Sequence, residues 1–235
     1  MAGKSSRFFK AGYKQPKYML PLGNESCVFD EAIKSFKKYF KSDLFLFIIR
    51  EGKEIKDFVT KQCVDLGIET YEIIVLDHDT SGQAETVFLG IDKSKLIDPN
   101  DDVYIFNIDS IRLNFEKPNK DFLNNIGGYL EVFKGKGDHW SFALPEEDNF
   151  VSKTTEKIRI SDLCSNGLYY FSSANLFVET YYDFGDVNNY NEFFIAPMYN
   201  IMIERGIRVK YKLIETNATL FSGVPSEYES LLNFF

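Results

Sequence analysis

Apolar and polar positions in the first half of the sequence alternate between a helical pattern and the pattern of buried strands. Apolar residues recur at helical spacing over residues 26–40, with Ser26 as the expected N-cap, and again over 55–66. The runs DLFLFIIRE (43–51) and YEIIVL (71–76) are apolar enough for strands that are buried on both faces. This order of elements predicts a β-α-β unit with parallel strands.

The same alternation continues for one more helix and one more strand. The stretch GQAETVFLGI (82–91) predicts a helix that opens on Gly82, and VYIFNI (103–108) predicts a strand that ends at Asp109. We therefore expect an α/β fold with a mostly parallel, Rossmann-like sheet and helices on both of its faces.

The pattern changes after residue 125. Short β-like runs separated by turn-forming residues predict a small antiparallel insertion; they are GGYLEVF (127–133), HWSFAL (139–144), NFVSKTT (149–155) and GLYYF (167–171). Helical spacing over 191–204, a strand over 208–214 and a last helix capped by Ser226 complete the chain. No linker or repeat interrupts it, so we predict a single domain over 1–235.

Composition narrows the classes of partner. The 235 residues carry a net charge of −8, which argues against nucleic acid and anionic membranes, because both select a basic surface. Cys27, Cys63 and Cys164 have no paired spacing, so neither a disulfide framework nor a zinc site is indicated. No apolar run reaches the ~20 residues of a membrane span, and no secretory signal is recognisable. We expect a cytoplasmic protein with no membrane partner.

The opening stretch MAGKSSRFFKAGYKQPKYML combines small residues with cations. Gly3, Ser5 and Ser6 stand beside Arg7, and Lys17 follows about ten residues later. Backbone amides of such a loop can hold phosphate oxygens while the two cations neutralise their charge. A solvated basic segment has the same composition, so this stretch alone leaves both interpretations open.

Four stretches together resemble the nucleotidyltransferases that make nucleotide sugars, most closely those of capsule and surface-polysaccharide pathways. They occur in the order of that family and span most of the chain. They are Ala2-Gly3-Lys4-Ser5-Ser6-Arg7-Phe8 with Gly12-Tyr13 and Pro16-Lys17, Thr80-Ser81-Gly82-Gln83-Ala84-Glu85-Thr86, Asn107-Ile108-Asp109, and Trp140-Ser141 leading to Glu156-Lys157 and Gly167-Leu168-Tyr169-Tyr170-Phe171.

The resemblance implies a fold of the GT-A type and a role for each matching position. Residues 1–125 would mainly bind the nucleotide and residues 126–235 mainly the acceptor. The implied roles are triphosphate binding by Ala2, Gly3, Lys4, Ser5 and Ser6, catalysis by Arg7 and Lys17, nucleotide binding by Gly82 and Gln83 with Gln83 against the nucleobase, Mg²⁺ binding by Asp109, and acceptor binding by Trp140, Glu156, Lys157 and Gly167. Many members carry a second metal-binding aspartate where this chain has Phe221.

The chemistry of nucleotidyl transfer suits the residues present. A phosphorylated acceptor has a second pKa near ~6, so at neutral pH it attacks without a general base. The chain has only two histidines, His78 and His139, which would supply a histidine triad poorly. Asp77-His78-Asp79 has the D-x-D spacing of a glycosyltransferase metal site, but a solvated turn is the simpler interpretation.

These observations predict transfer of a nucleoside monophosphate from an NTP (CTP, dTTP or another) to a phosphorylated acceptor, with release of pyrophosphate. A sugar 1-phosphate for capsule or surface polysaccharide is the first choice of acceptor. The sequence leaves open a cytidylyltransferase acting on a non-sugar metabolite such as phosphoglutamine, a glycosyltransferase of similar fold, a nucleotide-binding relative without turnover, and a homo-oligomeric state.

Overall fold

A computed structural model describes residues 1–23, 25–188 and 190–235. The chain forms two compact units, each assembled from separate stretches of sequence. Unit 1 contains Met1–Asp79, Asn107–Glu116 and Asn217–Phe235, and unit 2 contains Thr80–Phe106 and Lys117–Thr216. The two units are described one at a time, and the single domain with two functional halves stays a prediction.

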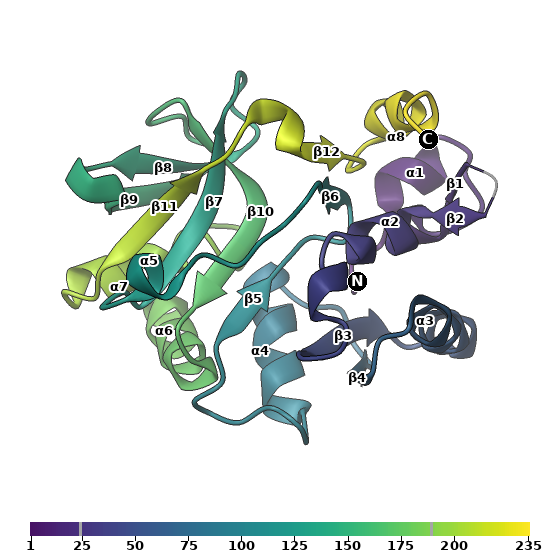
Figure 1. The fold of residues 1–235 in the computed structure, drawn as a ribbon, viewed down its shortest axis with the longest axis horizontal. Helices are drawn as coiled ribbons and strands as arrows, with labels where there is room; N and C mark the ends of the chain where they lie inside the picture. The colour runs from purple at the N-terminus through teal and green to yellow at the C-terminus, as the bar shows by residue number, and fades with distance from the viewer. Residues whose placement is uncertain (24, 189) are drawn as a thin grey trace. The chain divides into compact units, whose positions relative to one another are not determined.

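Unit 1 contains short elements at its start and end and one β-α-β unit between them (Figure 1). Its elements are α1 (Ser6–Lys10), η1 (Lys17–Met19), β1 (Pro21–Leu22), β2 (Ser26–Cys27), α2 (Val28–Lys34), η2 (Lys37–Tyr39), β3 (Leu44–Arg50), α3 (Lys53–Leu66), β4 (Thr70–Leu76), β6 (Ser110–Arg112), β12 (Thr219–Phe221) and α8 (Pro225–Leu232). The 3₁₀ turn η4 (Thr216–Ala218) begins at the last residue of unit 2.

The predicted β-α-β unit is confirmed in unit 1. Strands β3 and β4 pair in parallel over their full length, from Leu44 opposite Thr70 to Arg50 opposite Leu76, and α3 is the crossover between them. Ile49 of β3 and Val59 and Cys63 of α3 are fully buried in one cluster. Burial of these apolar side chains therefore stabilises the β-α-β unit that the apolar runs predicted.

A second cluster of unit 1 joins the beginning of the chain to its end. Strands β6 and β12 pair antiparallel, with Ile111 opposite Leu220. Phe8 of α1 is buried in this cluster with Tyr228 of α8, and their ring centroids lie 6.2 Å apart. Distant stretches of sequence thus complete the support of the opening loop.

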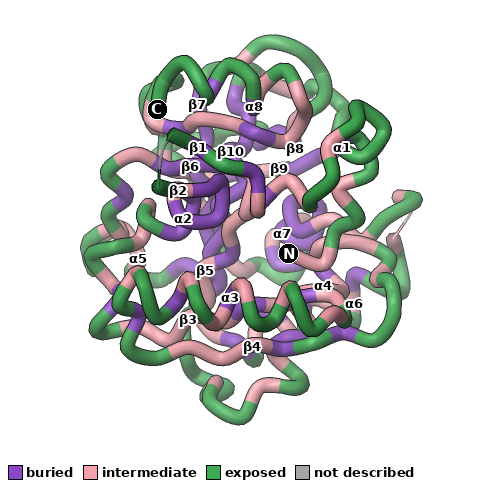
Figure 2. The backbone as a smooth tube through the Cα atoms, turned by 90° about the vertical axis from the view of Figure 1, so that its right-hand side faces the viewer, coloured by how far each residue is buried: buried purple, intermediate pink, exposed green. Residues whose placement is uncertain are grey.

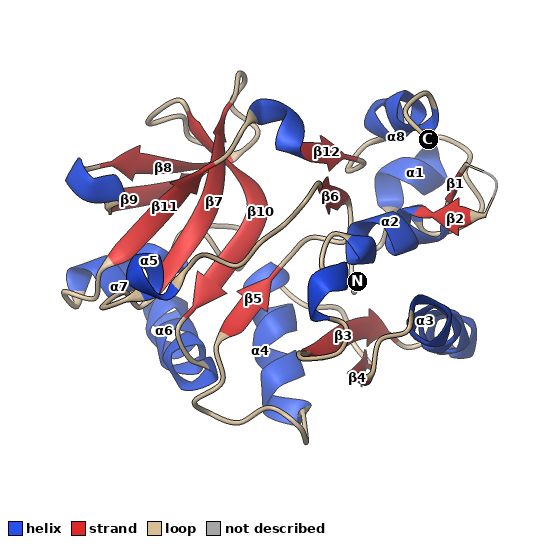
Figure 3. Cartoon of the chain, in the orientation of Figure 1, coloured by secondary structure: helices blue, strands red, loops and turns tan. Residues whose placement is uncertain are grey.

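Unit 2 is built on a six-stranded mixed sheet, drawn with red strands in Figure 3. Its elements are α4 (Gln83–Lys93), β5 (Val103–Ile105), α5 (Lys120–Leu123), β7 (Gly128–Lys134), β8 (Ser141–Pro145), η3 (Glu147–Asn149), β9 (Val151–Glu156), β10 (Leu163–Phe171), α6 (Ala174–Val187), α7 (Met198–Glu204) and β11 (Val209–Leu213). The strand order is β11-β7-β10-β8-β9, and β5 also pairs with β10.

The α/β class is confirmed, but the expectation of a mostly parallel sheet needs correction. Among the strand pairings of this sheet that the structure describes, β11 with β7 is parallel and the others are antiparallel. The short connection between β8 and β9 requires an antiparallel pair, whereas the parallel pair of β7 with β11 needs a long crossover, and the chain between these two strands is long. A bridge between Phe150 and Lys210 links the strand-β9 side of the sheet to β11.

The core of unit 2 lies where helices α4, α6 and α7 pack against the sheet. It contains Leu130 and Val132 of β7, Phe177 of α6 and Met202 of α7, all fully buried. Strand β10 is buried at every position. Purple marks the buried parts of the backbone in Figure 2. The sheet therefore provides a rigid support for polar side chains at its strand ends.

Several predicted helix boundaries are wrong. The helix expected over 26–40 is limited to α2, and the expected cap Ser26 instead donates its hydroxyl hydrogen to the carbonyl of Leu22 (2.5 Å). The carboxylate of Asp30 accepts from the backbone N–H of Cys27, which is the true N-cap. The helix expected over 191–204 begins only at Met198.

Two further expectations differ in detail from the structure. The last helix starts at Pro225 after Val224, not after a Ser226 cap, because the Glu227 carboxylate accepts from the Val224 N–H. The strand predicted over 103–108 is limited to β5, which ends at Ile105. Asp109 consequently lies within a short turn, in which the N–H of Ser110 donates to the carbonyl of Asn107.

Candidate active site

The opening loop of unit 1 turns sharply at Ser5. This residue has a left-handed backbone (φ 49°, ψ 30°), and its carbonyl accepts from the N–H groups of Phe8 and Phe9. Its hydroxyl oxygen accepts from the N–H of Lys17 at 3.2 Å. Ser5 therefore joins the loop that begins with Ala2, Gly3 and Lys4 to the second basic segment, and Ser6 begins α1.

Lys17 and Asp109 meet in unit 1. The Nζ of Lys17 lies 2.5 Å from the Oδ2 of Asp109, and the two side chains are 22% and 23% exposed. The carbonyl of Asp109 accepts from the N–H (2.8 Å) and the hydroxyl (3.1 Å) of Ser222, the residue after β12. Two predicted site residues that are 92 positions apart are thus brought into direct contact.

Lys4 and Arg7, the other two cations among the predicted site residues of the opening stretch, are placed differently. Lys4 pairs with the Oδ2 of Asp79 at 2.5 Å, and Arg50 pairs with the other oxygen of the same carboxylate at 2.9 Å. The hydrogen bond from Lys4 and the charge of Arg50 lower the pKa of Asp79. Arg7 is exposed on α1. Sequence reasoning missed this role of Asp79, although D-x-D spacing had singled the residue out.

The residues around Asp109 suit a magnesium ion that is completed by substrate oxygens. A Cβ built on Gly223 would lie 3.3 Å from the Oδ2 of Asp109 and 3.4 Å from the Oε2 of Glu227, so two carboxylates face the same glycine. The Oε2 of Glu227 already accepts from the N–H of Gly223 at 2.8 Å. Over residues 1–23, 25–188 and 190–235, no group of three or more His, Cys, Asp or Glu forms a metal cage. Mg²⁺ is typically held by one or two carboxylates and by phosphate oxygens, so this donor set fits it.

In unit 2, the two residues that were predicted to bind the nucleotide begin helix α4. Gly82 is its N-cap and Gln83 its first residue. A Cβ on Gly82 would lie 2.5 Å from both the backbone nitrogen and the backbone oxygen of Phe193. A close backbone approach therefore requires a glycine here, whether or not a nucleotide binds.

Glu156 lies at the end of β9, largely buried and next to β8. Its Oε2 accepts from the hydroxyl of Ser141 at 2.5 Å, and that hydroxyl is also 3.2 Å from the hydroxyl of Tyr169 on β10. Burial raises the pKa of the Glu156 carboxyl, which the Ser141 hydrogen bond and the charge of Lys157 partly oppose. Ser141 and Tyr169 were not predicted as site residues, although both lie inside the motifs quoted above.

Lys157 and Trp140 lie beside this group. Lys157 has a left-handed backbone (φ 55°), its N–H donates to the carbonyl of Trp140 at 2.9 Å, and its Nζ is 3.7 Å from the Oε1 of Glu156. The ammonium group also lies 4.7 Å from the ring centre of Phe194. The structure thus brings three predicted acceptor residues together at the β8–β9 pair.

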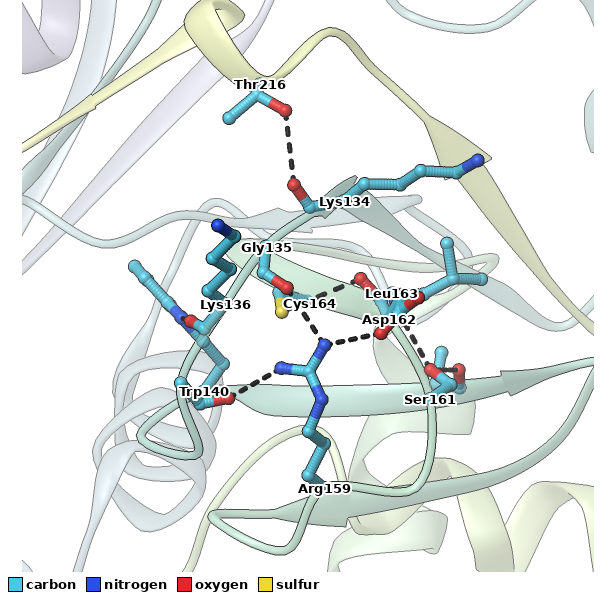
Figure 4. A network of polar contacts seen from close by, with 12 residues as sticks. Lys134, Gly135, Lys136, Trp140, Arg159, Ser161, Asp162, Leu163, Cys164 and Thr216 are labelled. Atoms are coloured by element: carbon cyan, nitrogen blue, oxygen red, sulfur yellow. Dashed lines mark hydrogen bonds and ion pairs between the residues drawn. The ribbon is translucent and has the colours of Figure 1, made fainter.

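The loop before Trp140 is held by Arg159, as Figure 4 shows. The Arg159 guanidinium donates to the carbonyls of Gly137 (2.7 Å) and Gly135 (3.0 Å) and to the Asp162 carboxylate (2.5 Å). The indole N–H of Trp140 donates to the carbonyl of Lys136 at 2.9 Å. These bonds fix the loop backbone and the orientation of the indole ring.

Gly167 is the fourth predicted acceptor residue and lies within β10. Its φ of +89° is a conformation that side-chain-bearing residues rarely adopt. The pairing of β10 with β7 shifts register between Ser165 and Tyr169, so Gly167 lies in a bulge.

Solved structures with this fold identify the class of enzyme. The chain superimposes on a nucleoside-diphosphate-sugar pyrophosphorylase from Vibrio cholerae RC9 with a TM-score of 0.93 and 43% sequence identity, over 99% of this chain and 98% of that one. The fold and this likeness define the protein as a nucleotidyltransferase. The match extends over nearly the whole length of both chains. This chain belongs to the nucleoside-diphosphate-sugar pyrophosphorylase family.

More distant structures share the fold alone. An inositol-1-phosphate CTP transferase from T. maritima matches with a TM-score of 0.72 and 16% identity over 99% of this chain and 92% of that one. A UDP-glucose pyrophosphorylase complexed with UDP-glucose matches with a TM-score of 0.75 and 14% identity over 99% and 95%. No protein-family model and no curated protein in the comparison matches the chain. Among the described residues, no helix is long and apolar enough to span a membrane.

Proposed function

We propose that this enzyme transfers a nucleoside monophosphate from an NTP to a sugar 1-phosphate and releases pyrophosphate. The observation that carries the proposal is the contact between Lys17 and Asp109, a cation and a carboxylate supplied by separate segments. The proposal is also supported by the 43% sequence identity of this chain to a nucleoside-diphosphate-sugar pyrophosphorylase.

In this reaction an oxygen of the acceptor phosphate forms a bond to the α-phosphorus of the NTP. The bond between that phosphorus and the oxygen bridging to the β-phosphate breaks, and pyrophosphate leaves with the electron pair. Arg7 and Lys17 neutralise the charge that grows on the leaving group, and the amides of Ala2, Gly3, Lys4, Ser5 and Ser6 hold the phosphate oxygens. The acceptor is already ionised at neutral pH, so no general base is needed.

Mg²⁺ is the cofactor that we assign to this site. Asp109 would hold it with one carboxylate oxygen, and Glu227 is the nearest second carboxylate that the geometry around Gly223 offers. When bound, the ion would supply charge neutralisation at the phosphates. Asp109 also orients the ammonium group of Lys17, which therefore has a fixed position in the site.

We assign the nucleobase and the acceptor to unit 2. Gln83 would bind the base, with Gly82 allowing the start of α4 to lie against Phe193. Lys157 would pair with the acceptor phosphate, and Glu156 would accept from a polar group on the acceptor body. Trp140 would give that body an apolar surface, and Gly167 would allow close approach of the backbone. The proposed setting is capsule or surface-polysaccharide synthesis in the cytoplasm.

Pyrophosphate release tests the reaction directly. The purified enzyme is incubated with Mg²⁺, each common NTP and a panel of acceptors that contains sugar 1-phosphates, inositol 1-phosphate and phosphoglutamine. Release that requires both an NTP and a sugar 1-phosphate supports the proposal. If pyrophosphate is released only with CTP and a non-sugar acceptor, the acceptor is a non-sugar metabolite and not a sugar 1-phosphate. If no pair of substrates releases pyrophosphate, the protein is a nucleotide-binding relative of these enzymes without turnover. Pyrophosphate formation also excludes a glycosyltransferase.

A further inference from the structure

The bulge that contains Gly167 is held by the side chains of its own neighbours. The hydroxyl oxygen of Ser165 accepts from the N–H of Gly167 at 3.1 Å, and the Oδ1 of Asn166 accepts from the N–H of Leu168 at 3.0 Å. Both backbone amides have lost regular ladder positions, because the register of β10 shifts here. The two side chains therefore satisfy donors that the bulge would otherwise leave buried.

Asn166 is itself oriented by a carboxylate on the neighbouring strand. The Nδ2 of Asn166 donates to the Oε2 of Glu131 on β7 at 3.0 Å. Asn166 is 1% exposed and Glu131 is 0% exposed. Because its Nδ2 is bonded to Glu131, the amide of Asn166 presents its oxygen to Leu168 and cannot flip without losing both bonds.

A fully buried glutamate in the middle of a sheet is costly unless it has partners. Strand β7 is otherwise apolar around this position, from Leu130 to Phe133. Lys212 of β11 supplies a cation, with its Nζ 3.5 Å from the Oε1 of Glu131. Apolar residues would fill this position at lower cost, so the carboxylate needs an explanation beyond packing.

We propose that Glu131 is a positioning residue of the acceptor subsite. Through Asn166 it fixes the bulge of β10 and thereby holds Gly167 in the left-handed conformation that brings the backbone close to the acceptor. The inference rests on the proposed function, because it takes Gly167 as an acceptor-binding residue. In this proposal Glu131 contacts no substrate itself and acts on the acceptor subsite through Asn166 and the bulge.

The geometry also specifies which property of Glu131 matters. The bond to Asn166 needs only an acceptor oxygen, which a glutamine amide supplies, whereas the pair with Lys212 needs the negative charge. Glu131→Gln should therefore preserve the bulge, and Glu131→Asp should not, because its carboxylate is one methylene shorter. Lys212→Met removes the cation and leaves the bond to Asn166 in place.

The test compares these variants in steady-state kinetics of pyrophosphate release, with the acceptor and the NTP varied separately. Glu131→Asp and Asn166→Ala should each raise the KM for the acceptor about tenfold, with kcat and the KM for the NTP changed less than about threefold. Glu131→Gln and Lys212→Met should stay within about threefold of the parent enzyme in all three quantities. Hydrogen exchange of the peptide 163–171 should be faster in the first pair only, since the Leu168 amide loses its acceptor.

Two control variants separate positioning from general destabilisation. Phe184→Leu, in the core on α6, should lower the melting temperature without raising the acceptor KM. Gly167→Ala should raise the acceptor KM, because alanine strains at a φ of +89°. Hydrogen exchange does not require activity, so it reports on the bulge even in a variant with weak turnover.

Each contrary result has a distinct meaning. If Gly167→Ala raises the acceptor KM but Glu131→Asp and Asn166→Ala do not, the inference is overturned and the proposed function stands. The inference also fails if Phe184→Leu raises the acceptor KM equally, or if Glu131→Gln behaves like Glu131→Asp. A parent-like acceptor KM in Gly167→Ala removes that residue from the subsite and overturns the inference together with this placement.

Discussion

Replacement of Gly82 by alanine should destabilise the protein for a reason that does not involve any ligand. The new Cβ would lie 2.5 Å from the backbone nitrogen and oxygen of Phe193 and 2.8 Å from its carbonyl carbon, where ordinary contacts are about 3.5–4.0 Å. The Phe193 backbone cannot yield easily, since its N–H donates to Ser81 (2.9 Å) and its carbonyl accepts from Ala84 (2.8 Å).

The size of the effect follows from these contacts. Overpacking costs about 1–3 kcal/mol, and loss of one of the two hydrogen bonds adds about 1 kcal/mol. For a chain of 235 residues, each kcal/mol corresponds to about 2–4 °C in melting temperature. The free energy of unfolding should therefore fall by about 2–4 kcal/mol and the melting temperature by about 4–16 °C.

Scanning calorimetry of Gly82→Ala beside Gly3→Ala provides the measurement. A Cβ on Gly3 meets no atom within 4 Å, so this control should melt within about 1 °C of the parent. A parent-like melting temperature for Gly82→Ala would refute the packing argument. If the melting temperature were unchanged and the KM for the NTP rose, the requirement for glycine at position 82 would instead come from close approach of the nucleotide.

Four further predictions concern the charged groups of the proposed site. Arg7→Ala and Lys17→Ala should each lower kcat/KM for pyrophosphate release by about 10²–10³ with little change in melting temperature, and near-parent kcat/KM would remove that residue from catalysis. Asp109→Asn should abolish turnover and excess chelator should do the same to the parent, whereas full activity in chelator would contradict a metal role. Lys157→Ala should raise the KM of every acceptor, while Glu156→Gln should narrow the difference in kcat/KM between good and poor acceptors; unchanged kinetics in both would place the acceptor elsewhere. Because burial raises the pKa of Glu156, the folded protein binds this proton more tightly than the unfolded chain, so the stabilising contribution is present below about pH 4 and is lost as pH rises through the raised pKa. The melting temperature of the parent minus that of Glu156→Gln should therefore decrease from acid to neutral pH, and a constant difference would contradict the shift.

Long apolar runs were the parts of the fold that the sequence predicted best. Strands β3 and β4 and helix α3 occupy the expected positions, because their burial depends on local pattern. Helix α6 was missed, since its tyrosines, phenylalanines and valines are residues typical of strands. Its start was marked by Ser173, whose hydroxyl oxygen accepts from the N–H of Leu176 at 3.0 Å.

The candidate site could be predicted only where a motif placed its residues. Lys17 and Asp109 came from two separate motifs, and only the structure shows that they are in direct contact; their roles stay predictions. Glu131 and Asn166 could not be paired from sequence, because they meet through the register of β7 and β10, which depends on long-range pairing. A lone glutamate within the apolar run GGYLEVF was the available indication of a buried carboxylate.

The three-part construction of unit 1 has a consequence during synthesis on the ribosome. The hydroxyl of Tyr228 donates to the carbonyl of Pro21, 207 positions earlier, and its ring covers Phe8. At about 5–20 residues per second, roughly 10–40 s separate the emergence of the opening loop from that of its covering helix. Unit 2 has all of its residues once Thr216 has emerged, so it can fold while the cluster around Phe8 is still incomplete. In the growing chain, the opening loop of unit 1 is therefore the last part to receive its apolar support and the first that a chaperone can bind.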